Sequence, residues 1–126
     1  MNMSSFTDKY FWWLPLGSVP EVSAQDLKRE ISKTRARPQL LDVRTHQEWR
    51  QGAIKGVVLV PVSSLKNQID ALPFDRTKPI VAICRSAHRS IPAVRLLRNA
   101  GYSDVRQLKG GMLSWQSLNY PIVEQR

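Results

Sequence analysis

The sequence predicts an α/β fold with a central parallel sheet of about five strands and helices on both faces of the sheet. Short apolar stretches alternate along the chain with segments whose apolar residues recur at helical spacing. Two of the apolar stretches, residues 57–60 and 79–83, contain no polar residue, which is typical of strands covered on both faces. Alternating strands and helices indicate a parallel sheet, because each helix carries the chain back to the start of the next strand.

In the first half of the chain, polar capping residues mark where two helices begin. Ser23 is placed to cap a helix that extends to about Lys33. Thr45 and Glu48 have the spacing of a capping box, so a short helix is predicted to begin there. The strands predicted in this half are a short edge strand at residues 21–22 and a buried strand at residues 40–43.

In the second half of the chain, helices again separate apolar strand segments. The predicted elements are a covered strand at residues 57–60, a helix from Ser63 or Ser64 to Leu72, a strand at 79–83, a helix at 91–99, a strand at 105–108 and a short helix after Gly110 and Gly111. Ser90 is placed to cap the helix at 91–99, and Gly101 is placed to end it.

The only cysteine of the chain, Cys84, lies between the strand at 79–83 and the helix at 91–99. A strand, a tight loop and a helix N-terminus together form an anion cradle, because the loop N–H groups and the positive helix end converge. Neighbouring cations such as Arg85 and Arg89 favour the thiolate, and sites of this kind lower a cysteine pKa to roughly 3.5–7.5. Guanidinium groups also suit an oxyanion such as thiosulfate or phosphate. We therefore predict a thiolate nucleophile for an anionic substrate; the alternative is a buried cysteine that only packs at a strand end.

Residues 84–90, Cys-Arg-Ser-Ala-His-Arg-Ser, resemble the active-site loop of rhodanese-type sulfurtransferases, which is usually written C-R-S-G-x-R-S. Further stretches follow the motifs of that family in the same order and cover roughly residues 19–123. They are Leu-Asp-Val-Arg at 41–44, Glu-Trp at 48–49, Gly-Ala-Ile-Lys-Gly at 52–56, Val-Pro at 60–61, Gly-Tyr at 101–102 with Val105, and the Gly-Gly motif at 110–111 with Trp115. Each motif is weak alone, and their common order makes the resemblance specific.

The resemblance implies that Cys84 is the nucleophile and carries a sulfane sulfur atom as a persulfide. It implies that Arg85 and Arg89 bind the anionic donor and stabilise the loop, with Arg89 counted with Cys84 as catalytic. The remaining loop residues would hold the persulfide charge through their backbone N–H groups; they are Ser86, Ala87, His88 and Ser90. In this scheme thiosulfate donates the sulfur, and cyanide or a thiol accepts it.

Three further residues are assigned a supporting role around the loop. Asp42 and Arg44 follow the end of a strand, where they either shape the rim of the site or form a structural ion pair; the resemblance favours the structural role. Trp115 either walls the pocket or fills the core.

Two positions depart from the family pattern. Ala87 stands where Gly is usual, and if the loop needs a positive φ there, Ala costs about 1 kcal/mol or more. Ala53 stands where His is usual, and we interpret this as a local surface change. His88 is expected to face solvent.

Several other functions remain open at this point. Cell-cycle phosphatase and arsenate reductase domains are similar but place the arginine six positions after the cysteine, whereas Arg89 is five positions after Cys84. A persulfide carrier that receives sulfur from a protein donor needs the same loop as a thiosulfate-using enzyme. A non-catalytic binding module would usually lack the cysteine.

The composition of the 126-residue chain indicates one domain at residues 19–126 after an aromatic N-terminal arm at residues 1–18. A single cysteine excludes an internal disulfide and fits a reducing cytoplasm. Two histidines and one cysteine, far apart in the chain, form no metal signature, and no cofactor is expected. The apolar run at residues 10–16 is short, broken by Pro15 and without a basic start, so it is a poor signal peptide. It would pack on the domain itself, dock a partner or a second copy, or contact a membrane interface.

The net charge of +9 is carried in part by two groups of basic residues. The groups are Lys28, Arg29, Lys33, Arg35 and Arg37, and then Arg95, Arg98, Arg106 and Lys109. We interpret them as a solvated basic face, which would also steer anionic donors or an acidic partner to the protein. There is no base-reading motif, so nucleic-acid binding is not predicted.

Overall fold

The computed structural model describes residues 12–13, 17–33 and 35–125, and a five-stranded sheet forms its centre. The strands lie in the order β1-β5-β4-β2-β3, and every neighbouring pair is parallel. The strands are β1(Glu21–Val22), β2(Gln39–Asp42), β3(Val58–Leu59), β4(Ile80–Ile83) and β5(Val105–Leu108). The predicted α/β class and the parallel sheet are confirmed.

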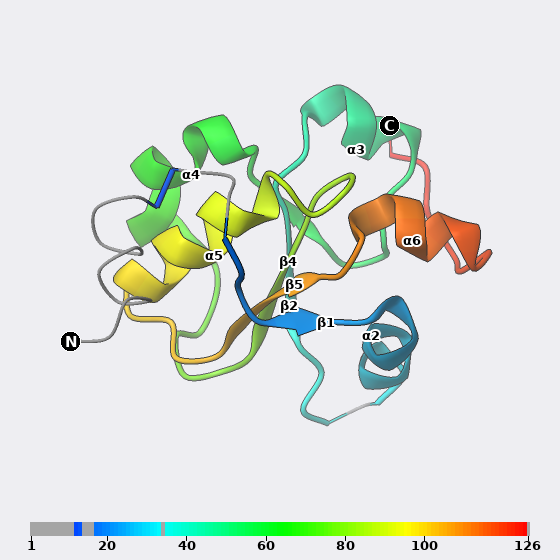
Figure 1. Cartoon of the computed structure of the whole chain (residues 1–126), viewed down its shortest axis with the longest axis horizontal. Helices are drawn as coiled ribbons and strands as arrows, with labels where there is room; N and C mark the ends of the chain where they lie inside the picture. Colours follow the sequence, from blue (N-terminus) through cyan, green and yellow to red (C-terminus); the bar gives the residue numbers. More distant parts are fainter. Residues whose placement is uncertain (1–11, 14–16, 34, 126) are drawn as a thin grey trace.

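Helices cover both faces of the sheet (Figure 1). On one face lie α4(Val62–Gln68) and α5(Ser90–Asn99), and on the other lie α2(Ala24–Ile31) and α6(Gly111–Ser117). The short helix α3(His46–Gln51) follows β2 at the end of the sheet where β4 also ends, and a 3₁₀ turn, Ile69–Ala71, follows α4. The chain therefore has the arrangement in which a ligand binds beyond the carboxyl ends of the strands.

Strand β4 lies in the middle of the core, and its four residues are all buried. Ile80 and Ala82 pack with the α4 and α5 side, whereas Val81 and Ile83 pack with the α2 and α6 side. This alternation explains why the sequence of β4 is apolar throughout, since both of its faces are covered. The loop that begins at Cys84 is thereby anchored on a strand that is buried along its whole length.

Two helix starts agree with the capping residues in the sequence. The Ser23 hydroxyl accepts a hydrogen bond from the Asp26 N–H (3.0 Å) at the start of α2. At the start of α3, the Glu48 N–H donates to Thr45 Oγ1 (3.2 Å), and the Thr45 N–H donates to Glu48 Oε1 (3.1 Å). The predicted capping box is confirmed.

The predicted ends of one strand and one helix were wrong, for reasons that the following contacts explain. The strand predicted at 57–60 is shortened to β3 and is only half-buried, because it forms an edge of the sheet. Helix α4 begins at Val62, directly after Pro61, and not at Ser63 or Ser64; it ends at Gln68 before the 3₁₀ turn. Pro61 occupies the N-cap position, and because its ring has no hydrogen-bond acceptor, the helix starts without a side-chain cap.

The described part of the N-terminal arm includes two tryptophans, Trp12 and Trp13. Trp12 is half-buried and packs against the cluster on the α4 and α5 side, with Lys66 Nζ 5.5 Å from the centre of its ring. Trp13 is exposed. The rest of the apolar run at residues 10–16 lies outside the described residues, and the boundary after residue 18 stays a prediction.

Candidate active site

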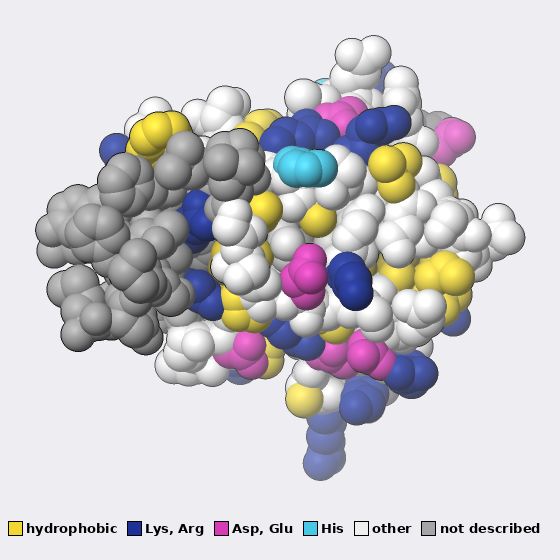
Figure 2. Space-filling view, in the orientation of Figure 1, with side chains coloured by type: hydrophobic (Ala, Val, Ile, Leu, Met, Phe, Trp, Pro, Cys, Tyr) yellow, Lys and Arg dark blue, Asp and Glu magenta, His cyan; other side chains and the backbone are white. Residues whose placement is uncertain are grey.

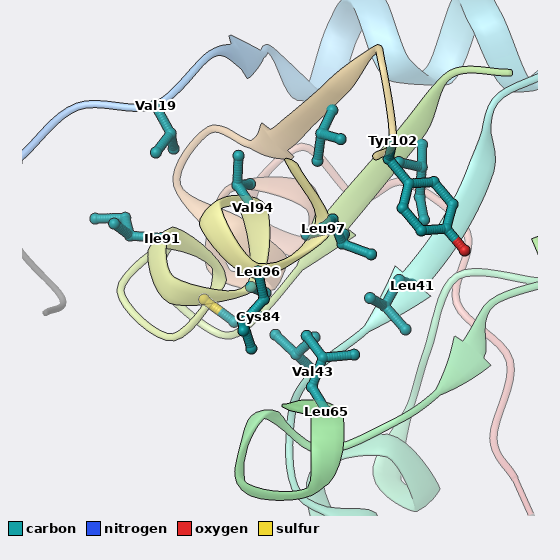
Figure 3. Packing of buried hydrophobic residues seen from close by; sticks show 14 of the residues in the cluster. Val19, Leu41, Val43, Leu65, Cys84, Ile91, Val94, Leu96, Leu97 and Tyr102 are labelled. Atoms are coloured by element: carbon teal, nitrogen blue, oxygen red, sulfur yellow. The ribbon is translucent and has the colours of Figure 1, made fainter. Parts of the chain in front are cut away.

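Cys84 directly follows β4 and is the first residue of the loop that leads into α5. Its side chain is buried in the cluster on the α4 and α5 side, with 1% of the residue exposed. Figure 3 shows the sulfur directed toward the loop and the first turn of α5. The cysteine thus combines a fixed position at a strand end with the approach to a helix N-terminus, as its place in the sequence predicts.

Ser90 does not cap α5, contrary to the prediction. The helix begins at Ser90 itself, after Arg89, and no side chain caps it. The buried Ser90 hydroxyl instead donates to Gln107 Oε1 on β5 (2.5 Å) and lies 3.4 Å from Cys84 Sγ. Since Gln107 is also buried, its side-chain oxygen needs a donor, and Ser90 supplies it.

The middle of the loop turns at Ala87, whose φ is +69°. This is the left-handed region that Gly adopts at no steric cost, so Ala87 keeps the backbone conformation expected of the usual Gly. Ser86 Oγ and His88 Nδ1 lie 3.0 Å apart across the turn, and His88 is exposed as predicted. Arg85 is also exposed.

The start of α6 forms backbone hydrogen bonds with the first two residues of the loop. The Met112 N–H donates to the Cys84 carbonyl oxygen (2.8 Å), and the Leu113 N–H donates to that of Arg85 (3.0 Å). Gly111 has a φ of +60°, and a Cβ there would overlap the Cys84 carbonyl oxygen. The second glycine of the Gly-Gly motif is therefore required by this close approach of two backbone segments.

Arg89 forms a bidentate ion pair with Glu48 of α3. The Nη atoms of Arg89 donate to the two carboxylate oxygens at 2.6 and 2.8 Å. The hydrogen bond from Arg89 is the main reason why the pKa of Glu48 falls from 4.5 to about 2, and bonds from Thr45 add to it. The same contact raises the pKa of Arg89. The pair joins the far end of the loop to α3. Glu48 is therefore a site residue, although its place in the sequence indicates only a helix cap and a family motif.

Asp42 and Arg44 form an almost completely buried ion pair. Arg44 Nε and Nη2 donate to Asp42 at 3.0 and 2.8 Å, and Nη2 also donates to the Gly52 carbonyl at 2.8 Å. Asp42 is 0% exposed and Arg44 is 4% exposed. Of the two roles considered, this arrangement has the geometry of the structural support.

Trp115 packs in the core cluster on the α2 and α6 side. It is buried, and its Nε1–H donates to the Pro121 carbonyl (2.9 Å). Ala53 is buried too, and pairs through its backbone with Val123, so the interpretation of a surface change at this position was wrong.

Two cavities lie beside the loop. One has a volume of about 120 Å³ and is lined by residues that include Arg44, Glu48, Arg85 and Met112. The other, of about 380 Å³, is lined by residues that include Glu21, Ala87, His88 and Gln107. Among the described residues there is no cluster of three or more His, Cys, Asp or Glu side chains suited to a metal ion.

The basic residues do not form one solvated face. Arg95 is buried, and Arg106 is paired with Glu30 at 2.8 and 3.0 Å. Figure 2 shows Lys and Arg side chains interspersed with Asp and Glu side chains on the face that it presents. None of the helices within residues 12–13, 17–33 and 35–125 is long and apolar enough to cross a membrane.

The fold and the loop agree with a known family. The family model for the rhodanese-like domain matches residues 23–118, so the chain belongs to the rhodanese-like domain family. The chain is 32% identical over 105 residues to a sulfurtransferase of Allochromatium vinosum, covering 83% of this chain and 95% of that protein. It is 30% identical over 112 residues to the human thiosulfate:glutathione sulfurtransferase, covering 79% of this chain and 96% of that one.

Other relatives show that the domain also occurs in longer proteins. An HTH-type transcriptional regulator of Mycobacterium tuberculosis is 39% identical over 87 residues, which is 68% of this chain but only 37% of the regulator. Among solved structures, a rhodanese-related protein from Thermoplasma volcanium superimposes with a TM-score of 0.75 at 30% identity, covering 85% of this chain and all of that one. The class of protein is therefore a rhodanese-like domain with sulfurtransferases among its relatives.

Proposed function

We propose that this protein is a sulfurtransferase that moves a sulfane sulfur atom through a persulfide on Cys84. The observation that carries the proposal is the position of Cys84 at the carboxyl end of β4, in a loop that turns directly into the N-terminus of α5. Such a position stabilises a negatively charged sulfur by backbone N–H groups and the helix dipole. Similarity to the two sulfurtransferases supports the reaction class.

The proposed reaction has two displacement steps. In the first step, the Cys84 thiolate attacks the outer sulfur of thiosulfate; a new S–S bond forms, the S–S bond of thiosulfate breaks, and sulfite leaves with the electron pair. In the second step, cyanide or a thiolate attacks the outer sulfur of the persulfide, and the electron pair returns to the Cys84 sulfur. No external oxidant or reductant is needed.

The proposed roles of the other residues follow from their contacts. Exposed Arg85 lines the cavity of about 120 Å³, so we assign it to the anionic donor. Arg89 is already paired with Glu48, so its main contribution is to hold the loop in shape while keeping positive charge near the sulfur. The N–H groups of Ser86, Ala87 and His88 are assigned to the persulfide charge.

A protein sulfur relay is the second candidate. A putative sulfur carrier protein of Bacillus subtilis is 30% identical over 98 residues, which cover 78% of this chain and 51% of that protein. In a relay, Cys84 would receive its sulfur from a persulfide on another protein, in a reducing compartment such as the cytoplasm. The residues of the site are the same in both cases, and only the donor differs.

The test is the intact mass of the protein after incubation with thiosulfate and again after addition of cyanide. We expect the mass to rise by one sulfur atom and then return to its starting value as thiocyanate forms. Cys84→Ser is expected to remain folded and to gain no sulfur. The double variant Cys84→Ser/Ser117→Cys, which moves the only thiol to an exposed position on α6, is the matched control and is also expected to gain none.

Three other outcomes would change the assignment. Sulfur uptake from a persulfidated protein but not from thiosulfate would favour the relay. Hydrolysis of an aryl phosphate would favour a phosphatase. A Cys84 that reacts with thiol reagents and takes sulfur from neither donor would overturn the proposal and leave a binding module.

A further inference from the structure

A continuous chain of polar contacts leads from Cys84 to the surface. We call the four residues the polar chain: Cys84, Ser90, Gln107 and Glu21. Cys84 Sγ lies 3.4 Å from Ser90 Oγ, Ser90 Oγ lies 2.5 Å from Gln107 Oε1, and Gln107 Nε2 lies 2.9 Å from Glu21 Oε2. The first three residues are buried, with 1%, 0% and 4% of each exposed, whereas Glu21 is exposed.

The direction of each hydrogen bond in the polar chain follows from Glu21. An ionised carboxylate only accepts hydrogen bonds, so the amide nitrogen of Gln107 must face Glu21. The amide oxygen of Gln107 then faces Ser90, and because that oxygen only accepts, the Ser90 hydroxyl must donate to it. A hydroxyl has one hydrogen, so Ser90 has none left for Cys84 and can only accept from the thiol.

We propose that Glu21 and Gln107 are positioning residues that orient the Ser90 hydroxyl so that it stabilises the neutral thiol of Cys84 before a donor binds. With the opposite orientation, Ser90 would donate to the sulfur and stabilise the thiolate. The polar chain therefore opposes the loop N–H groups and the helix N-terminus, which favour the anion. The inference concerns the protonation of Cys84 in the free protein. It rests on the proposed function only where Cys84 is taken to be the nucleophile of the reaction.

The outer end of the polar chain is accessible. Glu21 and Gln107 both line the cavity of about 380 Å³, together with Ala87 and His88 of the loop. The contact between Glu21 and Gln107 can thus be changed from outside without disturbing the buried residues. This makes Glu21 the best position for a test, since substitution of an exposed side chain leaves the core intact.

The test measures the ratio of thiolate to thiol of Cys84 from its ultraviolet absorbance, at one near-neutral pH. In Gln107→Met, Ser90 is free to donate to the sulfur, and we expect the ratio to rise about fivefold, as for one ordinary hydrogen bond. In Ser90→Ala, the thiol loses its acceptor, and we expect a smaller rise. In the double variant Ser90→Ala/Gln107→Met, the second substitution is expected to add nothing.

Two variants of Glu21 separate orientation from charge. Glu21→Met removes the acceptor of the Gln107 amide nitrogen, so the amide can turn over and present its N–H₂ group to Ser90. Ser90 is then free to donate to the sulfur, and we expect the ratio of thiolate to thiol to rise. Glu21→Gln removes the charge but retains a side-chain oxygen that accepts from Gln107, and is expected to stay close to the unmodified protein. Equal effects of both variants would show that charge alone is responsible and would overturn the proposal.

The control for an amide substitution is Gln39→Met. Gln39 begins β2, pairs with Ile80 at the start of β4, and uses its amide to bond the backbone of Asp75 and Lys78, so it lies at the opposite end of the sheet from Cys84. We expect no change in the thiolate ratio. The charged groups around the loop are retained in all variants of Ser90 and Gln107; they are Arg85, His88, Arg89 with Glu48, and Asp42 with Arg44.

The outcomes for the inference and for the proposed function are independent. A fall of the thiolate ratio in Ser90→Ala would show that Ser90 donates to the sulfur, and would overturn the inference even if Cys84 forms a persulfide. Failure of Cys84 to take up sulfur would overturn the proposed function even if the ratios follow the expected order. Circular dichroism of each variant confirms that the ratios come from folded protein.

Discussion

Two arginine–carboxylate pairs support the region around Cys84, and they differ in their burial and in the distance along the chain between their partners. Arg44 and Asp42 are two residues apart, and their side chains are 5% and 0% exposed. Arg89 and Glu48 are 41 residues apart, and their side chains are 34% and 26% exposed. The first pair is a local part of the chain after β2, whereas the second joins α3 to the end of the Cys84 loop.

Because the two pairs differ in burial, we expect them to support different properties: the stability of the fold and the shape of the loop. A buried charge that loses its partner cannot be hydrated, so breaking a buried pair is costly. A half-exposed arginine is hydrated when its partner is removed, so the loss of stability is smaller. We therefore expect the Asp42–Arg44 pair to matter most for folding and the Arg89–Glu48 pair to matter most for the geometry of the loop.

The largest effect is expected for Asp42→Asn, which leaves the Arg44 guanidinium buried without a counter-charge. The free energy of unfolding should fall by about 3–5 kcal/mol in urea denaturation. Asp70→Asn is the control, since Asp70 is paired with Arg76 at 3.4 Å but is 92% exposed; its loss should stay below about 1 kcal/mol. Equal losses in the two variants would remove the distinction between buried and exposed pairs.

A smaller effect on stability is expected for Glu48→Gln, about 2 kcal/mol for the loss of charge-assisted hydrogen bonds. The rate of sulfur uptake by Cys84 should fall by a larger factor than in Asp70→Asn, because the glutamine side chain offers Arg89 one acceptor oxygen without charge in place of two charged ones, and so holds it to α3 less firmly. Uptake at the unmodified rate would mean that the loop keeps its shape without this pair.

The stability that Glu48 contributes should depend on pH in a defined direction. Its pKa is lowered from 4.5 to about 2 in the folded protein, mainly by the hydrogen bond from Arg89. The contribution is therefore complete above pH 4.5 and is lost as the pH falls toward about 2. The difference in unfolding free energy between the unmodified protein and Glu48→Gln should shrink over this window; a constant difference would contradict the role of the ionised carboxylate.

The parts of the fold and of the site that are local in the chain could be predicted from the sequence. The strand, loop and helix around Cys84 are contiguous, so their order and apolar pattern sufficed to predict them. The Asp42–Arg44 pair is equally local, and an ion pair was among the expectations for it. In each case the partners are neighbours in the chain.

Contacts between distant segments were not predicted. Arg89 was assigned both to the donor anion and to stabilising the loop, but nothing in the sequence indicates that Glu48 is its partner. Ser90 was assigned to a helix cap because its actual partner, Gln107, is brought near only when β4 and β5 pair. Ala53 was placed on the surface because its burial depends on the C-terminal segment at Val123.

The smallest effect is expected for Ala87→Gly, which tests whether strain within the loop or support from outside determines its shape. Ala87 has a φ of +69°, where Ala is less favourable than Gly, so the substitution should raise the free energy of unfolding by about 1 kcal/mol. Because α6 and the Arg89–Glu48 pair hold both ends of the loop, its shape should not change, and the rate of sulfur uptake should stay within about twofold.

Ala36→Gly is the matched control for this last substitution. Ala36 has a φ of +59° and is exposed in the segment between α2 and β2, so it should gain similar stability with no effect on sulfur uptake. A large gain in rate for Ala87→Gly alone would show that Ala distorts the cradle around Cys84. In that case α6 and the Arg89–Glu48 pair would not be sufficient to fix the shape of the loop. A residue in the middle of the loop would then affect both the stability of the protein and the geometry around Cys84.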